Sequence, residues 1–170
     1  MQNVFSYPLI VDDISTSEKK YTIKADTKQL SHIKDILKVP DIVSLNAILF
    51  TELSRSTNLL KIWGNIKLTL KLESVISLEL FEKDIKIEFS SQYDIKMTRK
   101  EQKELEEISD NVPEIIYDGK IDFADIIIEQ IALNLDDYPR KDGEVFDFQP
   151  EFDVEEKITK NPFDVLKTLK

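Results

Sequence analysis

The stretch LLKIWGNIKLTLKLE, residues 59–73, decides the fold because its polar and apolar residues alternate almost without interruption. A period of two residues is typical of a β-strand, whose successive side chains point to opposite faces of a sheet. The apolar row comprises Leu60, Ile62, Ile66, Leu68, Leu70 and Leu72, and the polar row comprises Lys61, Trp63, Asn65, Lys67, Thr69 and Lys71. Gly64 interrupts the apolar row, where we expect a bulge, a bend or a close backbone approach.

Extended segments flank this strand on both sides. The run 42–53 is largely apolar, which predicts a strand buried on both faces. Residues 84–97 alternate again, and residues 74–82 either continue the sheet or turn a corner. The second apolar row comprises Ile85, Ile87, Phe89, Tyr93, Ile95 and Met97. Because the connections are short, we predict an antiparallel, curved sheet or a partly open barrel.

Two helices are predicted beside this sheet. Residues 27–38 follow Asp26, which caps the helix together with Gln29 in a capping box, and Pro40 ends it. Asp122 caps a second helix over 123–135, which is apolar almost all round and is therefore expected to lie buried across the sheet. The predicted fold is a single α+β domain over residues 1–135, with 101–120 as a charged linker or insertion within it.

The C-terminal part has a different composition. Residues 1–100 hold 15 basic and 13 acidic side chains, a net charge of +2, whereas residues 101–170 hold 8 and 20, a net charge of −12. Residues 136–160 mix acids with isolated aromatics, which predicts an acidic, flexible, partly disordered tail. The ending NPFDVLKTLK, residues 161–170, predicts a short helix with Asn161 as N-cap and Pro162 at the first helical position.

The terminal helix has one apolar side, formed by Phe163, Leu166 and Leu169. So short a helix is marginal alone in water, so we expect it to dock on its own domain or on a partner. The acidic tail has two interpretations: it engages a basic protein or folds back on the lysine-bearing strand, or it is only a solubilising extension.

The composition excludes several classes of chemistry. The chain has no cysteine and a single histidine, His32, which excludes disulfides, thiol catalysis and multi-histidine metal sites. It has only three glycines, with no phosphate-binding glycine loop and no GxSxG or HExxH motif. We therefore expect no enzyme, no metal and no cofactor. The N-terminus has no basic segment followed by an apolar one, and no membrane-spanning run follows, so the expected location is the cytoplasm, away from membranes.

The polar row of residues 59–73 is the best candidate binding surface. Lys61, Lys67 and Lys71 can neutralise phosphates while Trp63 offers a stacking platform, a combination that single-stranded RNA binders use. The alternative is that these lysines only prevent strand-to-strand aggregation and that Trp63 packs under a loop. Glu129 likewise has two interpretations: a desolvated carboxylate poised for a partner, or a helix residue that reaches the surface.

Three segments together resemble a known family. GNIKLTLKLESVISLELFE, DGKIDFADIIIEQIALNLDDYPR and the ending NPFDVLKTLK follow one another as they do in the YceD family of large ribosomal RNA subunit accumulation proteins. The second segment looks most like the alphaproteobacterial branch. The family's recurrent residues fall here on Gly64, Leu78, Glu79, Glu129, Leu133, Pro139, Asn161, Pro162, Phe163, Leu166 and Lys167. Many relatives carry a cysteine at the position of Ser74, so a metal or redox role suggested for them does not operate here.

The resemblance implies a non-enzymatic role in the synthesis, processing or stability of 23S rRNA. The implied partners are 23S rRNA or its precursor, bound directly or indirectly, and a large-subunit ribosomal protein or assembly factor. The candidate docking residues are Glu129, Pro139, Arg140, Asn161, Pro162, Phe163, Leu166 and Leu169. The alternative is an acidic adaptor or chaperone for a basic ribosomal protein that never contacts RNA.

Overall fold

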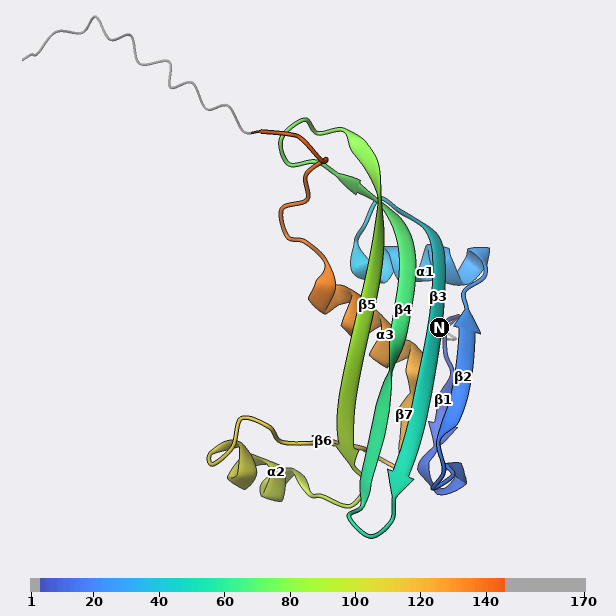
Figure 1. The fold of residues 1–170 in the computed structure, drawn as a ribbon, viewed down its shortest axis with the longest axis vertical. Helices are drawn as coiled ribbons and strands as arrows, with labels where there is room; N and C mark the ends of the chain where they lie inside the picture. Colours follow the sequence, from blue (N-terminus) through green and yellow to red (C-terminus); the bar gives the residue numbers. More distant parts are fainter. Residues whose placement is uncertain (1–3, 146–170) are drawn as a thin grey trace, which may run out of the picture.

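Three long consecutive strands form the centre of the fold. The computed structural model describes residues 4–145 of the chain and contains β3 (Asp41–Ser54), β4 (Leu59–Glu73) and β5 (Leu80–Asp94) (Figure 1). Each strand pairs antiparallel with the next, with Leu60 opposite both Leu53 and Tyr93. The alternating stretch 59–73 is therefore the central strand of a meander, as its pattern predicts.

Two shorter strands complete the sheet. Its order is β2-β3-β4-β5-β6, where β2 (Lys19–Lys24) is antiparallel to β3 and β6 (Glu114–Ile115) is parallel to β5. A separate two-stranded sheet joins β1 (Pro8–Ile10) to β7 (Lys120–Asp122). The predicted α+β class with a mostly antiparallel sheet is confirmed, and the sheet is open.

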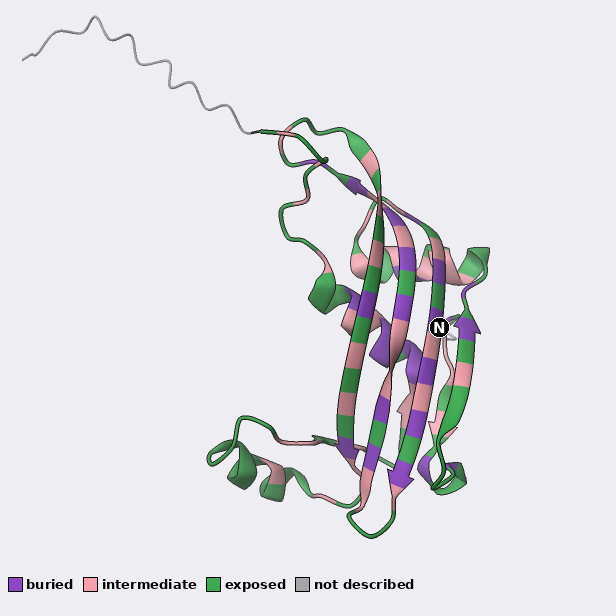
Figure 2. Ribbon diagram, viewed as in Figure 1, coloured by how far each residue is buried: buried purple, intermediate pink, exposed green. Residues whose placement is uncertain are grey.

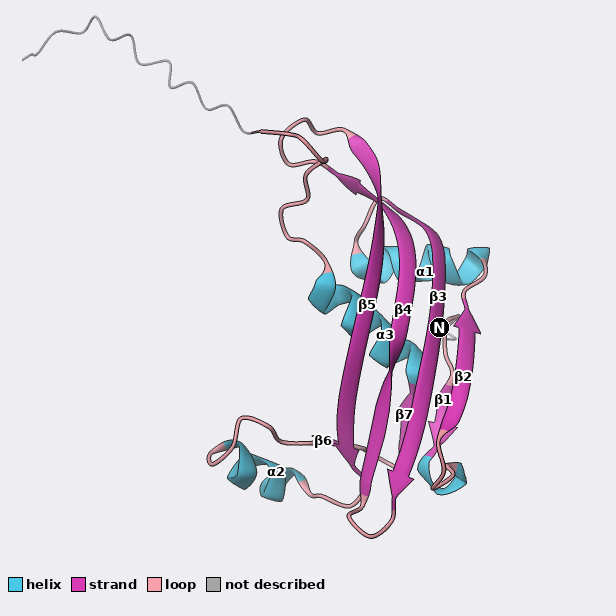
Figure 3. Cartoon of the chain, in the orientation of Figure 1, coloured by secondary structure: helices cyan, strands magenta, loops and turns pink. Residues whose placement is uncertain are grey.

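Helices cover one face of this sheet. In Figures 1 and 3, α1 (Thr27–Leu37) and α3 (Phe123–Asn134) lie behind the long strands, while α2 (Arg99–Glu106) stands apart near β6. A single-turn helix, η1 (Val11–Asp13), follows β1. Ile33 of α1, Ile127 of α3 and Ile66 of β4 are all fully buried in one core. The opposite face, which we call the outer face, is covered by no described helix or loop.

Helix starts follow the predicted local chemistry. Asp26 accepts hydrogen bonds from the backbone N–H groups of Lys28 and Gln29, and the Gln29 side chain accepts one from the Asp26 N–H, which completes the capping box. Asp122 caps α3 through the Ala124 N–H at 2.8 Å and also accepts from the Tyr7 N–H at 2.7 Å. Asp122 thus joins the start of α3 to the N-terminal segment.

Gly64 is a point of close backbone approach, one of the predicted alternatives. A Cβ atom at this position would lie 2.0 Å from the carbonyl oxygen of Ile48 and 3.0 Å from the Cα of Leu49. Both are backbone atoms of the neighbouring strand β3, so no side-chain rotation relieves the clash. Glycine is therefore required for β3 and β4 to approach each other here.

Two predictions about burial are wrong. Strand β3 is not buried on both faces, because Asn46 and Glu52 are exposed and Ile48 and Phe50 are only half-buried. An apolar run does not distinguish a strand covered on both sides from one whose second face is uncovered. Helix α3 is buried on one side only, and Leu133 on its other side is 71% exposed.

Candidate nucleic-acid interface

The outer face carries the polar row predicted from the sequence. Along the long strands buried and exposed side chains alternate, which appears as bands in Figure 2. Lys61 and Lys67 are exposed, while Trp63 and Lys71 are half-buried. All four belong to β4, the central strand, so neighbours on both sides complete the surface.

An aromatic pair lies at the centre of this face. Trp63 is paired across the strands with Phe50 of β3, and their rings stack with centroids 5.7 Å apart and planes inclined by 16°. The Lys61 ammonium group lies 5.2 Å from the centre of the Trp63 ring, within reach of a cation–π interaction. Trp63 is therefore contacted by a ring and a cation, and, contrary to the alternative interpretation, no loop among residues 4–145 covers it (Figure 1).

The register brings further lysines beside this pair. Lys20 of β2 is paired with Phe50, and Lys24 of β2 is paired with Asn46, which is itself paired with Lys67. Lys67 in turn lies opposite Lys86 of β5. Three strands thus contribute to one surface of lysines around two stacked rings, which we call the Lys–Trp surface: Lys20, Lys24, Phe50, Lys61, Trp63 and Lys67.

Lys71 is separated electrostatically from the Lys–Trp surface. Its Nζ lies 3.9 Å from a carboxylate oxygen of Asp41, and Glu82 is its cross-strand neighbour on β5. Two nearby carboxylates reduce its attraction for a phosphate. Of the four predicted residues, the structure brings together Lys61, Trp63 and Lys67 and places Lys71 in an acidic environment.

Sequence reasoning missed Phe50 and the two β2 lysines. Alternation within 19–24 and 46–52 does place them on one side of their strands. It does not show that this side matches the side of Trp63, because the strand register decides that. The missing information was therefore the pairing between strands, and no signal within a single segment contains it.

Glu129, a candidate docking residue, lines an acidic hollow between α3, β6 and β7. The hollow also holds Tyr93, Glu114, Asp122 and Asp125. Burial, and next the charge of Glu129, raises the pKa of Glu114, while burial followed by the charge of Asp122 raises that of Asp125. Burial and the charge of Glu114 also raise the pKa of the Tyr93 phenol. Lys120 also lines the hollow, so four carboxylates share it with one ammonium group. Glu129 itself is exposed, as a helix residue that reaches the surface.

Hydrogen bonds join the segment after α3 to the turn between β4 and β5. The carbonyl of Pro139, another candidate docking residue, accepts a hydrogen bond of 2.9 Å from the Val75 N–H. The Glu144 carboxylate accepts from the hydroxyls of Ser74 and Ser77, and the Lys141 ammonium donates to Glu79. Hydrogen bonds from Ser74, then Ser77, lower the pKa of Glu144. These hydrogen bonds hold residues 139–144 against the domain, and we call this segment the clasp.

The remaining docking candidates have different placements. Arg140 belongs to the clasp and lines a hollow between the clasp and Phe81 and Lys83 of β5. Residues Asn161, Pro162, Phe163, Leu166 and Leu169, and the predicted terminal helix, lie outside the described residues. So does most of the predicted acidic tail.

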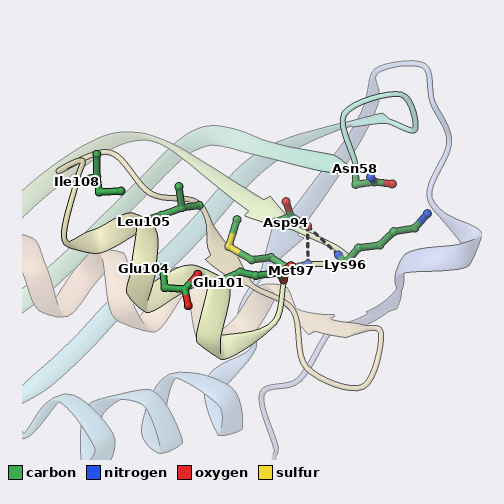
Figure 4. A pocket seen from close by; sticks show the side chains of 8 residues that line it. All are labelled: Asn58, Asp94, Lys96, Met97, Glu101, Glu104, Leu105 and Ile108. Atoms are coloured by element: carbon green, nitrogen blue, oxygen red, sulfur yellow. Dashed lines mark hydrogen bonds between the residues drawn. The ribbon is translucent and has the colours of Figure 1, made fainter.

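A third hollow lies between α2 and the end of β5, with a volume of about 530 Å³ (Figure 4). Leu105 and Ile108 of the α2 region line it together with Met97, and its charged lining includes Glu101 and Glu104. Asp94 also lines this hollow, and its carboxylate accepts hydrogen bonds from the backbone N–H groups of Lys96 and Met97, each at 2.8 Å (Figure 4). Lys96 is the single cation of its lining against the carboxylates of Asp94, Glu101 and Glu104, so the hollow has an excess of negative charge and is not suited to binding phosphate.

Two further searches concern the described residues 4–145. No group of three or more His, Cys, Asp or Glu side chains among them is arranged to hold a metal ion. None of their helices has the length and apolar character needed to cross a membrane.

Comparison with known proteins identifies the family. The chain matches no curated protein and no solved structure. A family model described as "Large ribosomal RNA subunit accumulation protein YceD" matches residues 62–170, which is more than half of the chain. The match does not separate branches of the family, so the alphaproteobacterial assignment stays a prediction. The chain belongs to the YceD family of large ribosomal RNA subunit accumulation proteins.

Proposed function

We propose that this protein supports accumulation of large-subunit rRNA by binding single-stranded RNA on the Lys–Trp surface, without catalysing a reaction. The observation that carries the proposal is the Phe50–Trp63 stack, which lies between lysines of β2 and β4 on a sheet face that no segment of residues 4–145 covers. Aromatic rings on an open sheet provide a stacking platform for unpaired bases, and the lysines neutralise the phosphates between them. Because every base has a flat face, such a surface binds with little sequence preference.

The charges support binding by the middle of the sheet in preference to its margins. Lys67 lies in a row with Lys24 and Lys86, whereas acids gather toward β5 and the clasp end of the sheet. Glu52 lies opposite Lys61 in the register of β3 and β4, but among the described residues neither Lys61 nor Lys67 lies in an ion pair within 4.0 Å, whereas Lys71 has Asp41 at 3.9 Å. RNA bound across Trp63 would therefore cross the strands from β2 toward β4.

RNA-binding affinity of three variants tests the proposal. Trp63→Ala should weaken binding of a labelled single-stranded 23S precursor fragment about 5-fold to 150-fold, because stacking of one base on an aromatic ring contributes about 1–3 kcal/mol. The double variant K61S/K67S should lower the salt-dependence slope by about 1.4, because each lost phosphate contact contributes about 0.7 for single strands. K100S/K103S removes the same charge from α2 and should bind as the wild type does.

The same variants should be examined in cells that lack the native protein. We expect Trp63→Ala and K61S/K67S to lower 23S rRNA relative to 16S rRNA, and K100S/K103S to restore it fully. Unchanged RNA affinity together with normal 23S levels in the first two variants would contradict the proposal.

The acidic hollow around Glu129 favours a second function, that of an adaptor for a basic protein segment. Glu114 and Asp125 hold partly desolvated carboxylates whose ionised form is disfavoured, so a lysine or arginine side chain would relieve their repulsion. Replacing Glu129 by Gln is nearly isosteric and removes one charge. A loss of 23S rRNA in this variant, with unchanged RNA affinity, would favour the adaptor.

A further inference from the structure

Strand β5 has an open edge along most of its length. It pairs with β4 from Leu80 to Asp94, but on its other side, within residues 4–145, β6 pairs only with Tyr93 and Asp94. The stretch from Leu80 to Gln92 therefore has backbone donors and acceptors with no partner strand among the described residues. Residues 140–142 share a hollow with residues 81–84 at one end of this stretch, and residues 111–114 share one with residues 90–92 at the other. Long open edges are sites where another strand adds to a sheet.

The hydrogen bonds show which residues of β5 present this edge. The Ile95 N–H donates to Asn58 on the β4 side, whereas the Asp94 carbonyl accepts from Ile116 on the β6 side. In an antiparallel pair, residues bonded to the partner alternate with residues whose N–H and C=O groups point away. The even-numbered residues of β5 therefore point their backbone groups to the open edge, namely Glu82, Asp84, Lys86, Glu88, Ser90 and Gln92.

The side chains of these residues select one antiparallel register for a second β5 strand. With a two-fold axis at Ile87, Lys86 lies opposite Glu88 of the second copy, twice by symmetry, and no like charges meet. An axis at Lys86 pairs two lysines, and an axis at Glu88 pairs two glutamates. An axis at Ile85 opposes Glu82 to Glu88 of the second copy. Like charges directly opposite one another destabilise a sheet, so the Ile87 register is selected.

The opposite face of the strand agrees with this register. With the axis at Ile87, the two Ile87 side chains meet on the core side, and Ile85 lies opposite Phe89 of the second copy. Ile85 and Phe89 are only half-buried within one subunit, so pairing would extend their apolar contacts. In this register Glu82 lies opposite Gln92 of the second copy, and the next residue of β5, Tyr93, is already paired with Glu114 of β6.

We infer that β5 is a dimerisation edge, at which two copies pair antiparallel about Ile87 and form one continuous sheet of both subunits. A two-fold axis perpendicular to a sheet leaves equivalent faces on the same side. The two Lys–Trp surfaces would consequently face the same way. The inference stands on β5 alone and does not depend on the proposed RNA binding.

Charge-swap variants of the full chain test this inference. Lys86 and Glu88 are well exposed, with side chains 61% and 73% accessible, and they form an ion pair of 3.0 Å within one subunit. Reversal of either charge therefore removes only an exposed ion pair and should leave the fold intact. K86E and E88K each replace two attractive pairs by two repulsive ones, which should weaken dimerisation about 10-fold or more. The swap K86E/E88K recreates opposite pairs and should restore the dimer. K100E, on the exposed face of α2, is the control for charge alone.

Sedimentation over a wide range of protein concentration gives the readout, together with hydrogen exchange of the amides of residues 82–92. Loss of the dimer in both single variants and its return in the swap would support the inference. A protein that stays monomeric at every concentration would overturn it, as would a dimer that all four variants leave unchanged. If the monomer's edge amides were protected and became unprotected on deletion of residues 146–170, the chain's own C-terminal segment would occupy the edge instead.

Discussion

Replacement of Gly64 by alanine should be one of the most destabilising single changes in the sheet. The added Cβ would lie 2.0 Å from the Ile48 carbonyl oxygen and 3.0 Å from the Ile48 carbonyl carbon, well inside normal contact distance. Since both atoms belong to the backbone of β3, relief requires β3 and β4 to separate locally. The steric overlap should lower the free energy of unfolding by about 1–3 kcal/mol. About two weakened hydrogen bonds between β3 and β4 should lower it by about 1 kcal/mol each.

The opposing gain is small. Alanine restricts the unfolded chain more than glycine does, which contributes about 0.4–1 kcal/mol in favour of the variant. The net expectation is therefore a loss of about 3 kcal/mol from a domain whose total stability is about 5–15 kcal/mol. Urea unfolding followed by far-ultraviolet circular dichroism measures this loss through the shift of the transition midpoint.

Two alanine variants separate the steric cause from others. Asn65→Ala changes the adjacent residue on the outer face of the same strand and should alter stability by less than about 0.5 kcal/mol. Gly119 has φ +61° and no atom within 4 Å of a built Cβ, so Gly119→Ala isolates the left-handed backbone cost of about 1–2 kcal/mol. A Gly64→Ala protein as stable as Asn65→Ala would refute the close approach of β3 and β4.

Three further predictions concern single groups in the core and at its margin. Asp122→Ala removes the α3 cap and the acceptor of the Tyr7 N–H, so urea unfolding should show a loss of about 2–4 kcal/mol, whereas Asp122→Asn should lose less. Thr51 is fully buried and its hydroxyl has no hydrogen-bond partner among residues 4–145, so Thr51→Val should stabilise the fold by about 1 kcal/mol and raise the melting temperature. Burial raises the pKa of Glu114 in the folded state, so its protonated form is favoured there and this stabilisation is lost as pH rises through that pKa. Glu114→Gln should therefore raise the urea midpoint relative to wild type at pH 7, and the difference should shrink toward pH 4; a constant difference would indicate a cause other than ionisation.

Local and periodic features of this fold were predictable from the sequence. The capping box of Asp26 and Gln29 depends on residues three apart, and the alternation in 59–73 depends on neighbours two apart. Both are confirmed because chain-local geometry determines them. The apolar row of Ile85, Ile87 and Phe89 likewise lies on the core side of β5.

Features that depend on contacts between distant segments were not predictable. The burial of β3 on both faces was wrongly predicted because an apolar run shows hydrophobicity and not what covers each face. The Phe50–Trp63 pair requires the β3–β4 register, and the clasp requires Ser74 to meet Glu144 across 70 residues of chain. The site residues predicted on β4 were accessible to sequence reasoning, since they alternate within one strand, whereas their partners on β2 and β3 were not.

The central claim is that Trp63 contacts RNA bases, and its own fluorescence tests this most directly. Trp63 is the single tryptophan of the chain, so intrinsic emission reports on this position alone. Titration of the full-length protein with an unlabelled single-stranded 23S precursor fragment should quench the emission, with a midpoint that matches the affinity of the labelled fragment and shifts in K61S/K67S. If RNA binds by the independent assay while Trp63 emission stays unchanged, the Lys–Trp surface is not where the RNA lies.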